Sequence, residues 1–239
     1  MTVREVRAEL KALANPEIAA HSQRFFKTGP GEYGEGDRFL GIRVPRIRAL
    51  AKRCRGLTLD QVNSLLQARW HEERLLAVII LTHHFASGSE SERRAICALY
   101  LANTHRVNNW DLVDASAHLI VGPWLQDRPR DLLRRLARSD SLWERRIAMM
   151  ATYCYIRQND YADALDIAEL LLDDEHDLIH KVCGWMLREI GKRDQAVAEE
   201  FLQDHGHRMP RTMLRYAIEK YPEDLRQRYL RGDFSSPAR

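Results

Sequence analysis

Residues 177–190 read DLIHKVCGWMLREI, and this stretch indicates the fold class. Its apolar residues recur at the three- and four-residue spacing of an α-helix and cover two of its sides, which is typical of a helix packed between two layers. Helices of the same kind are expected to begin near residues 70, 110, 143 and 211, so that successive starts are 40, 33, 34 and 34 residues apart. This period is typical of helical hairpins that stack in a row, each burying its apolar face against its neighbours.

Helix signals continue along the rest of the chain. Proline stands in the first turn of two expected helices, at Asn15-Pro16 and Val44-Pro45, and Thr58 with Gln61 forms a capping box. No segment shows the two-residue alternation of a strand bounded by hairpin turns. The sequence therefore predicts an all-α fold, a superhelical solenoid of antiparallel helix pairs with a concave basic groove. We expect a single domain over residues 1–239, with a flexible tail at 231–239. The other expected helices span residues 89–105, 130–137, 142–157, 161–172 and 195–203.

The composition is that of a globular protein. Of the 239 residues, 45% are hydrophobic and 30% are charged, which argues against disorder. The longest apolar run, Leu75–Leu81, is far too short to span a bilayer, and the N-terminus has no signal-peptide core. The four cysteines form no CxxC pair, which argues against a disulfide framework or a zinc finger. We therefore expect a reduced, cytoplasmic protein with no membrane association.

Basic residues are concentrated locally, although the net charge is only +3. Six basic side chains and no acidic one lie between Arg43 and Arg55. A polyanion responds to such a patch rather than to the total charge, but the same pattern also occurs on a solvated helix face. A groove formed by stacked hairpins suits a long, stiff ligand such as a DNA duplex, or another protein.

The segment 27–37, KTGPGEYGEGD, interrupts the helical pattern with four glycines and a proline. Gly29, Gly31 and Gly34 match the spacing of a dinucleotide-binding loop, but no strand precedes them, and the acidic residues of the segment would repel a pyrophosphate. We expect a Gly-rich surface loop, which is either a plain connection or a mobile loop that touches a substrate.

The stretch 108–114, NNWDLVD, opens a helix and carries the first candidate site residues. Asp111 falls in the first turn, where a carboxylate offsets the helix dipole. Asp114 lies one turn further along and shares a side of the helix with Trp110 and Val113. A carboxylate on such an apolar stripe is costly to desolvate. Asp114 is therefore either a functional carboxylate, or one half of an internal ion pair or a helix cap.

Two further helices place basic residues beside aromatic ones. Lys181, Trp185, Arg188 and Lys192 lie on one helix face. This pattern can hold a phosphate backbone and present a π surface, or it is a core tryptophan beneath snorkelling basic side chains. In the helix that contains residues 143–146, WERR, Arg146 points from a largely apolar face.

No metal and no cofactor are expected. His176 and His180 have the spacing of two zinc ligands on a helix, but no HExxH motif accompanies them. The sequence also lacks a P-loop, a serine-hydrolase elbow and a cysteine-nucleophile motif.

Taken together, these residues resemble the AlkD-like DNA alkylation repair family of HEAT-like-repeat DNA glycosylases. The resemblance rests on four motifs in the family's order and spacing, Phe39–Pro45, Trp110–Asp114, Trp143–Arg146 and Gly184–Glu189. It implies that Asp114 is the catalytic carboxylate, that Trp110 and Trp185 contact the lesion-bearing nucleotide, and that Arg146 contacts a phosphate.

The sequence departs from the family at its N-terminal end. The Gly-rich insert replaces a much shorter connection, and Phe25 or Phe26 stands where the family has a tyrosine. Both departures affect the N-terminal contacts to DNA that the resemblance implies. Besides the motif residues named above, the candidate DNA-binding residues are Phe25, Arg43, Arg46, Lys181 and Arg188.

The resemblance implies a monomeric enzyme that hydrolyses the N-glycosidic bond of N3- or N7-alkylated, cationic purines in double-stranded DNA, as a step of base excision repair. Two alternatives remain open from the residues. One is a HEAT-repeat protein that binds bent or branched DNA without catalysis, and the other is a helical scaffold that binds proteins.

Overall fold

The computed structural model describes residues 1–235, and these residues form an all-helical structure, which confirms the predicted fold class. Outside the helices, the described residues contain one isolated bridge between Arg38 and Trp70. Contacts divide the chain into two compact units, Met1–Trp124 and Leu125–Arg239, which we call the N-terminal and C-terminal units. Whether the two behave as the single domain expected from the sequence stays a prediction.

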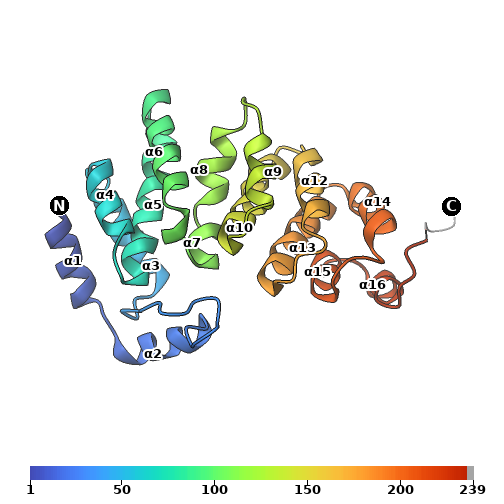
Figure 1. The fold of residues 1–239 in the computed structure, drawn as a ribbon, viewed down its shortest axis with the longest axis horizontal. Helices are drawn as coiled ribbons and strands as arrows, with labels where there is room; N and C mark the ends of the chain where they lie inside the picture. Colours follow the sequence, from blue (N-terminus) through green and yellow to red (C-terminus); the bar gives the residue numbers. More distant parts are fainter. Residues whose placement is uncertain (236–239) are drawn as a thin grey trace. The chain divides into compact units, whose positions relative to one another are not determined.

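The N-terminal unit is organised around α5 (His71–Ser87), which packs against most of its neighbours (Figure 1). Every residue from His71 to Thr82 is buried, so this helix forms the core of the unit. The other elements of this unit are α1 (Val3–Ala12), α2 (Pro16–Phe25), α3 (Val44–Arg53), α4 (Leu59–Leu66), α6 (Glu90–Ala102), the short 3₁₀-helix η1 (Thr104–Arg106), α7 (Trp110–Asp114) and α8 (Ala117–Trp124).

Side-chain caps define where several of these helices begin. Thr58 accepts a hydrogen bond from the backbone N–H of Gln61, and the Gln61 side chain accepts one from the backbone N–H of Thr58, so the predicted capping box is confirmed. The same reciprocal arrangement starts α1 at Thr2 and α6 at Ser89. Each box satisfies backbone donors that a helix leaves without a partner in its first turn.

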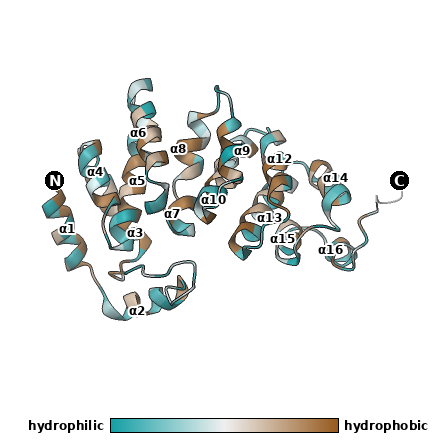
Figure 2. Ribbon diagram, viewed as in Figure 1, coloured by the Kyte–Doolittle hydropathy of each residue, from teal (hydrophilic) through white to brown (hydrophobic). Residues whose placement is uncertain are grey.

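In the C-terminal unit, α13 (Asp177–Gly191) packs against helices on several sides, as its apolar pattern predicts. Its Gly184 allows the closest of these contacts, because a Cβ there would overlap the backbone oxygen of Met213. Most helices carry both apolar and polar residues (Figure 2), as expected for helices with one face on a core. The other helices of this unit are α9 (Asp131–Ala137), α10 (Leu142–Ala151), α11 (Tyr153–Ile156), α12 (Ala162–Leu170), α14 (Gln195–His205), α15 (Arg211–Ala217) and α16 (Glu223–Leu230).

Two predicted segments differ from the structure. The helix expected over 142–157 is interrupted at Thr152, whose backbone N–H donates to the oxygen of Met149, three residues back (3.2 Å). In the segment expected to be a tail, Phe234 is 6% exposed and stacks on Tyr229, with ring centres 5.7 Å apart. Residues 236–239 of that expected tail lie outside the described residues.

Within the described part of the chain, no helix is long and apolar enough to cross a membrane.

Candidate functional site

The helix α7 is a single turn that presents Trp110 and Asp114 on its outer side. It begins at the buried Asn109, whose side-chain oxygen accepts a hydrogen bond from the backbone N–H of Trp110 (2.9 Å). Leu112 and Val113 are fully buried and fix the inner side of the turn in the core. Trp110 and Asp114 are both partly exposed, and their four-residue spacing places them on the same side of the helix.

Trp110 is one member of an aromatic cluster. Its ring stacks on Phe26, with centres 5.2 Å apart and planes 17° apart, and Phe25 meets it edge-on at 6.0 Å. Phe26 in turn stacks on the buried Phe39 at 4.9 Å. Phe25 is 57% exposed, so the cluster ends in an open aromatic surface. The residues at the position of the family's tyrosine therefore lie directly beside Trp110.

Beneath Asp114 lies a fully buried tyrosine. The Tyr100 hydroxyl lies 2.9 Å from the hydroxyl of Ser116, and burial raises the pKa of Tyr100 well above its usual value. The negative charge of Asp114 adds to that rise. Asp114 therefore stands at the border between the core of the unit and its surface.

The other first-turn carboxylate of α7, Asp111, belongs to a buried charged network. His71 places its Nε2 at 2.8 Å from Asp111 and its Nδ1 at 2.9 Å from Asp37. Arg74 donates to the second oxygen of Asp37 (2.8 Å). We name Asp37, His71, Arg74 and Asp111 the His71 network. His71, Arg74 and the Asp37 carboxylate are each no more than 3% exposed.

Burial acts on the pKa values of His71 and Asp37 in favour of their neutral forms, and the charged partners of each group oppose this effect. Burial disfavours the charged form of His71, but the Asp111 and Asp37 carboxylates outweigh it and raise the pKa of His71 to about 9. Burial likewise acts to raise the pKa of Asp37, yet the bond from His71 and the Arg74 guanidinium hold it below its usual value. Near neutral pH these shifts favour a protonated His71 and an ionised Asp37.

The predicted residues of the C-terminal unit lie on two of its helices. Arg146 on α10 is only 4% exposed and donates to the backbone oxygen of Leu178 (2.6 Å), which joins α10 to the start of α13. Its neighbour Arg145 forms a 2.6 Å ion pair with Asp174, in the loop before α13. In these contacts Arg146 holds two helices together, and its contact to a phosphate stays a prediction.

The stripe on α13 combines one aromatic ring with basic side chains. Trp185 is partly exposed and lies near Tyr153, with ring centres 6.3 Å apart. Lys181 pairs with Asp177 at 2.7 Å, and Arg188 pairs with Glu219. Lys181 and Arg188, two of the cations predicted to contact DNA, therefore already pair with acidic side chains.

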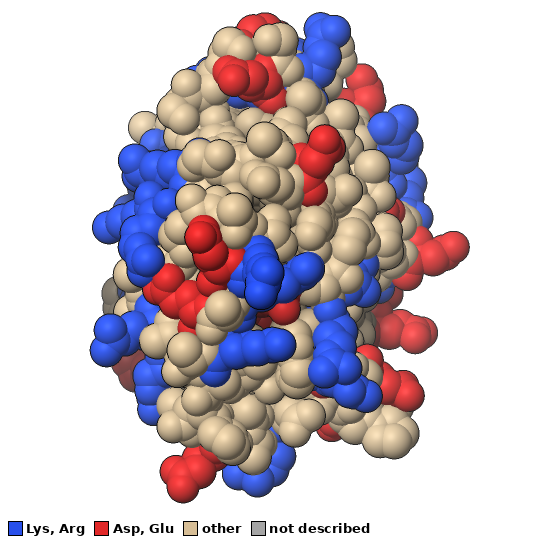
Figure 3. Space-filling view, turned by 90° about the vertical axis from the view of Figure 1, so that its left-hand side faces the viewer, with Lys and Arg blue, Asp and Glu red and all other residues tan. Residues whose placement is uncertain are grey.

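The basic segment of the N-terminal unit lies at the surface. Arg43 and Arg46 are both exposed, at the start of α3. In Figure 3, which views the chain from the side of its N-terminal helices, Lys and Arg gather along the margins of the face, whereas acidic and basic residues mix near its centre. On the face shown, the positive charge is therefore local.

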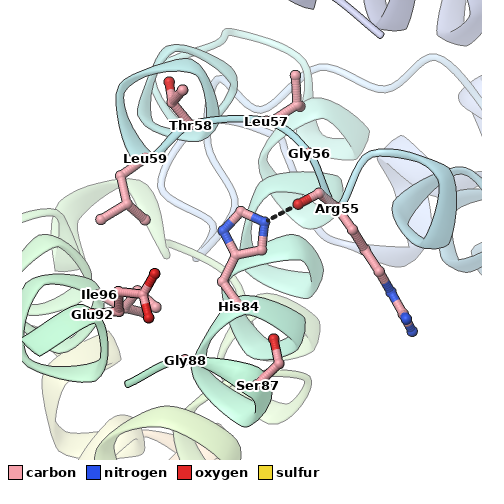
Figure 4. Close-up of a pocket in the computed structure, with 10 residues that line it drawn as sticks. All are labelled: Arg55, Gly56, Leu57, Thr58, Leu59, His84, Ser87, Gly88, Glu92 and Ile96. Atoms are coloured by element: carbon pink, nitrogen blue, oxygen red, sulfur yellow. Dashed lines mark hydrogen bonds between the residues drawn. The ribbon is translucent and has the colours of Figure 1, made fainter. Parts of the chain in front are cut away.

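A surface pocket opens between the loops that precede α4 and α6 (Figure 4). His84 lies in it with Nε2 2.9 Å from the backbone oxygen of Arg55. Burial, together with the positive charge of Arg55, lowers the pKa of the neighbouring His83. This pocket shares no lining residue with the Trp110 and Asp114 surface.

Among the described residues, no group of His, Cys, Asp and Glu side chains is arranged to hold a metal ion. The four cysteines are free thiols.

The sequence pattern did not single out His71, Asp37 or Glu72. All three are buried, and Glu72 accepts hydrogen bonds from the backbone N–H groups of residues 40–42 at 2.7 to 3.2 Å. One signal was available, because charged residues at 71–74 directly precede the strongly apolar run 75–81 on the same helix. Such residues at the start of a buried helix need partners from other segments.

Comparisons with known proteins agree with this architecture. A family model described as DNA alkylation repair enzyme matches residues 6–221. A solved structure described as a predicted DNA alkylation repair enzyme from Enterococcus faecalis superposes with a TM-score of 0.69 at 21% identity, over 88% of this chain and 97% of that one. That likeness shows a shared fold. The comparison with curated proteins gives no match. Because the family model spans most of the chain, the protein belongs to the DNA alkylation repair enzyme family.

Proposed function

We propose that this protein is a DNA glycosylase that hydrolyses the N-glycosidic bond of N3- or N7-alkylated purines in double-stranded DNA. The observation that carries the proposal is the pairing of Trp110 and Asp114 on the partly exposed side of α7, in a chain of the alkylation repair family. An aromatic face and a carboxylate four residues apart are the two groups that this reaction needs most.

The chemistry requires little more than one carboxylate. A purine alkylated at N3 or N7 carries a positive charge, so it leaves as a neutral base once the bond from C1′ to nitrogen breaks and the electron pair passes to the base. The sugar then resembles an oxocarbenium ion, which an anionic Asp114 stabilises. Water attacks C1′ and loses its proton to Asp114 or to solvent, which leaves an abasic site and the free base.

Aromatic rings contribute to the recognition of the lesion. The faces of Trp110 and Trp185 attract a cationic nucleotide through cation–π contacts of about 0.5–2 kcal/mol each. The exposed Phe25 extends the aromatic surface beside Trp110. The resemblance implies that Phe25 or Phe26 stands in place of a tyrosine and lacks its hydroxyl. We assign contacts with the phosphate backbone to the basic residues Arg43, Arg46, Arg146, Lys181 and Arg188.

The test is the release of alkylated base from a methylated duplex by the wild type and by Asp114→Asn. The amide keeps the size of the side chain but cannot stabilise positive charge or accept a proton, so we expect the single-turnover rate to fall about 100-fold or more. Asp60→Asn is the matched control, because Asp60 is an exposed carboxylate in the first turn of α4 in the same unit. This control should retain the wild-type rate.

Each other outcome has a definite meaning. Equal release of 7-methylguanine or 3-methyladenine by wild type and Asp114→Asn would show that Asp114 is not the catalytic group. Salt-dependent binding of a duplex by the wild type without any base release would favour the DNA-binding protein without catalysis. We propose a monomer as the active form, which sedimentation in the presence of a short duplex would check.

A further inference from the structure

The His71 network joins three segments that are far apart in the sequence. Asp37 is the last residue of the Gly-rich segment, His71 and Arg74 begin α5, and Asp111 lies in the first turn of α7. His71 is 34 residues from Asp37 and 40 residues from Asp111. A single buried imidazole therefore connects the Gly-rich segment with the helix that carries Trp110 and Asp114.

The geometry fixes the protonation state of the imidazole. Both ring nitrogens of His71 lie within 2.9 Å of a carboxylate oxygen. An ionised carboxylate only accepts hydrogen bonds, and a neutral imidazole has only one N–H to donate. Between two ionised carboxylates, both bonds can form together only when the ring is protonated on both nitrogens. Two carboxylates then face two cations, because Arg74 shares Asp37 with His71.

The same imidazole also touches the aromatic cluster. Its ring stacks on Phe39 with centres 4.5 Å apart, and it lies 5.1 Å from Phe26. Phe26 carries the stacked Trp110. His71 thus reaches α7 by two routes, through the carboxylate of Asp111 and through the ring beneath Trp110.

The Gly-rich segment is folded in a way that delivers Asp37 to this place. The backbone N–H groups of Gly29 and Gly31 donate to the carboxylates of Glu32 and Glu35, both at 2.9 Å. The backbone N–H of Asp37 donates to the oxygen of Gly34 (3.0 Å). The side chains of Glu32 and Glu35 therefore stabilise the turns of the segment to which they belong.

We propose that His71, as a doubly protonated imidazolium held between Asp37 and Asp111, is a positioning residue that fixes α7 and so orients Trp110 and Asp114. The inference rests on the proposed function for the roles of Trp110 and Asp114. It also gives the Gly-rich insert a function. The insert supplies Asp37, which contacts Nδ1 of His71, whereas Asp111 of α7 contacts Nε2. His71 itself is buried and touches no substrate.

The experiment compares His71→Gln with His84→Gln. Glutamine keeps a polar side chain of similar length, but it carries no charge and lacks the two separate N–H donors with which an imidazolium bridges the carboxylates. His84 lies on the same helix and contacts the backbone oxygen of Arg55, away from α7, so the same substitution there is the matched control. Three quantities are measured: the nitrogen shifts of the His71 ring, the indole N–H signal of Trp110, and the single-turnover rate of base release. Trp110→Phe assigns the indole signal.

In the wild type at pH 7.5 we expect both ring nitrogens of His71 to carry protons. In His71→Gln the Trp110 signal should shift while that of Trp185, on the other unit, stays in place. The rate should fall about 10-fold or more, because small displacements of reacting groups slow a reaction strongly. The affinity for undamaged duplex should change little, since phosphate contacts dominate it. His84→Gln should behave as the wild type in all of these measurements.

Asp111→Asn provides a second variant in case His71→Gln does not fold. The amide keeps an oxygen for the backbone N–H of Leu112, which Asp111 now binds at 3.0 Å, but removes the charge that faces His71. We expect the Trp110 signal to shift and the His71 ring to lose its proton at lower pH. The charged groups around the ring are then Asp37, Arg74 and, further away, Arg106.

A neutral His71 ring at pH 7.5, or an unchanged Trp110 signal in both variants, would overturn the proposal. An unchanged rate in a folded His71→Gln protein would also overturn it. If the wild type releases no base at all, the proposed function fails, and the ring protonation and the Trp110 signal still decide whether His71 positions α7.

Discussion

At the scale of single residues, Gly41 shows why the segment Phe39–Pro45 has its sequence. Its φ is +80°, in the left-handed region, and a Cβ there would overlap the backbone oxygen of Asn15 at the start of α2. Only glycine meets both conditions without strain. The glycine of this motif therefore allows the backbone at Gly41 to lie close to the backbone at Asn15.

This contact leads to a prediction for Gly41→Ala. The new methyl group meets backbone atoms that cannot move independently, so we expect the free energy of unfolding to fall by about 3 kcal/mol or more. Gly56→Ala is the control, because a Cβ at Gly56 meets nothing within 4 Å. Urea unfolding of the two variants measures the difference, and equal stabilities would show that α2 can move away from Gly41.

Residue patterns predicted one carboxylate of α7 better than the other. Helical spacing placed Asp114 on the same side as Trp110, and both are partly exposed in the structure. The same prediction put Val113 on that side, but Val113 is fully buried and lies on the inner side of α7. The sequence assigned Asp111 only a role at the helix dipole. The partner of Asp111 is His71, 40 residues earlier, and no local spacing predicts a contact between such distant segments.

At the scale of secondary-structure elements, the start of α5 holds the segment that precedes α3. One Glu72 oxygen accepts from the backbone N–H groups of Gly41 (2.7 Å) and Ile42 (3.2 Å), and the other accepts from that of Leu40 (2.8 Å). Glu72 is 3% exposed. A buried carboxylate thus replaces the sheet or helix partners that this extended segment lacks.

We predict that Glu72→Gln destabilises the protein, although it only replaces one carboxylate oxygen by an NH2 group and removes the negative charge. The amide nitrogen would face a backbone donor, which leaves a buried N–H without an acceptor and costs about 1–3 kcal/mol. Glu17→Gln, at an exposed first-turn position of α2, is the control and should change the stability by less than about 0.5 kcal/mol. Thermal unfolding of both variants tests this. If the two substitutions change the stability equally, the hydrogen bonds of Glu72 to residues 40–42 do not stabilise the fold.

Elements were predicted well where a local signal starts or stops them. The capping box at Thr58 and the helix beginning at Asp177 follow from side chains within one turn of the helix end. The break at Thr152 was missed because a threonine in a helix is common. Thr82 makes the same hydroxyl bond to the oxygen three residues back within the unbroken α5.

At the scale of the whole molecule, charge acts through pairs and not through the sum of +3. Basic residues that the sequence assigned to DNA, such as Lys181 and Arg188, have acidic partners nearby. His71 is a buried cation whose carboxylate partners Asp37 and Asp111 are 2% and 14% exposed, and folding raises its pKa to about 9. The stability of the chain should therefore depend on pH between about 6.5 and 9 through the charge of His71.

The sign of this dependence follows from the pKa of His71, which folding raises from 6.5 to about 9. Below pH 6.5 the ring is protonated in the folded and the unfolded chain, and its contribution to stability is fully present. Between pH 6.5 and 9 the unfolded chain loses this proton while the folded chain keeps it, so the contribution falls as the pH rises and is lost above 9, by about 3 kcal/mol in all. Urea unfolding at pH 6.5, 7.5 and 9 measures the loss. The decline should be absent from His71→Gln and present in His84→Gln; the same decline in all three proteins would mean that the charge on His71 does not stabilise the fold.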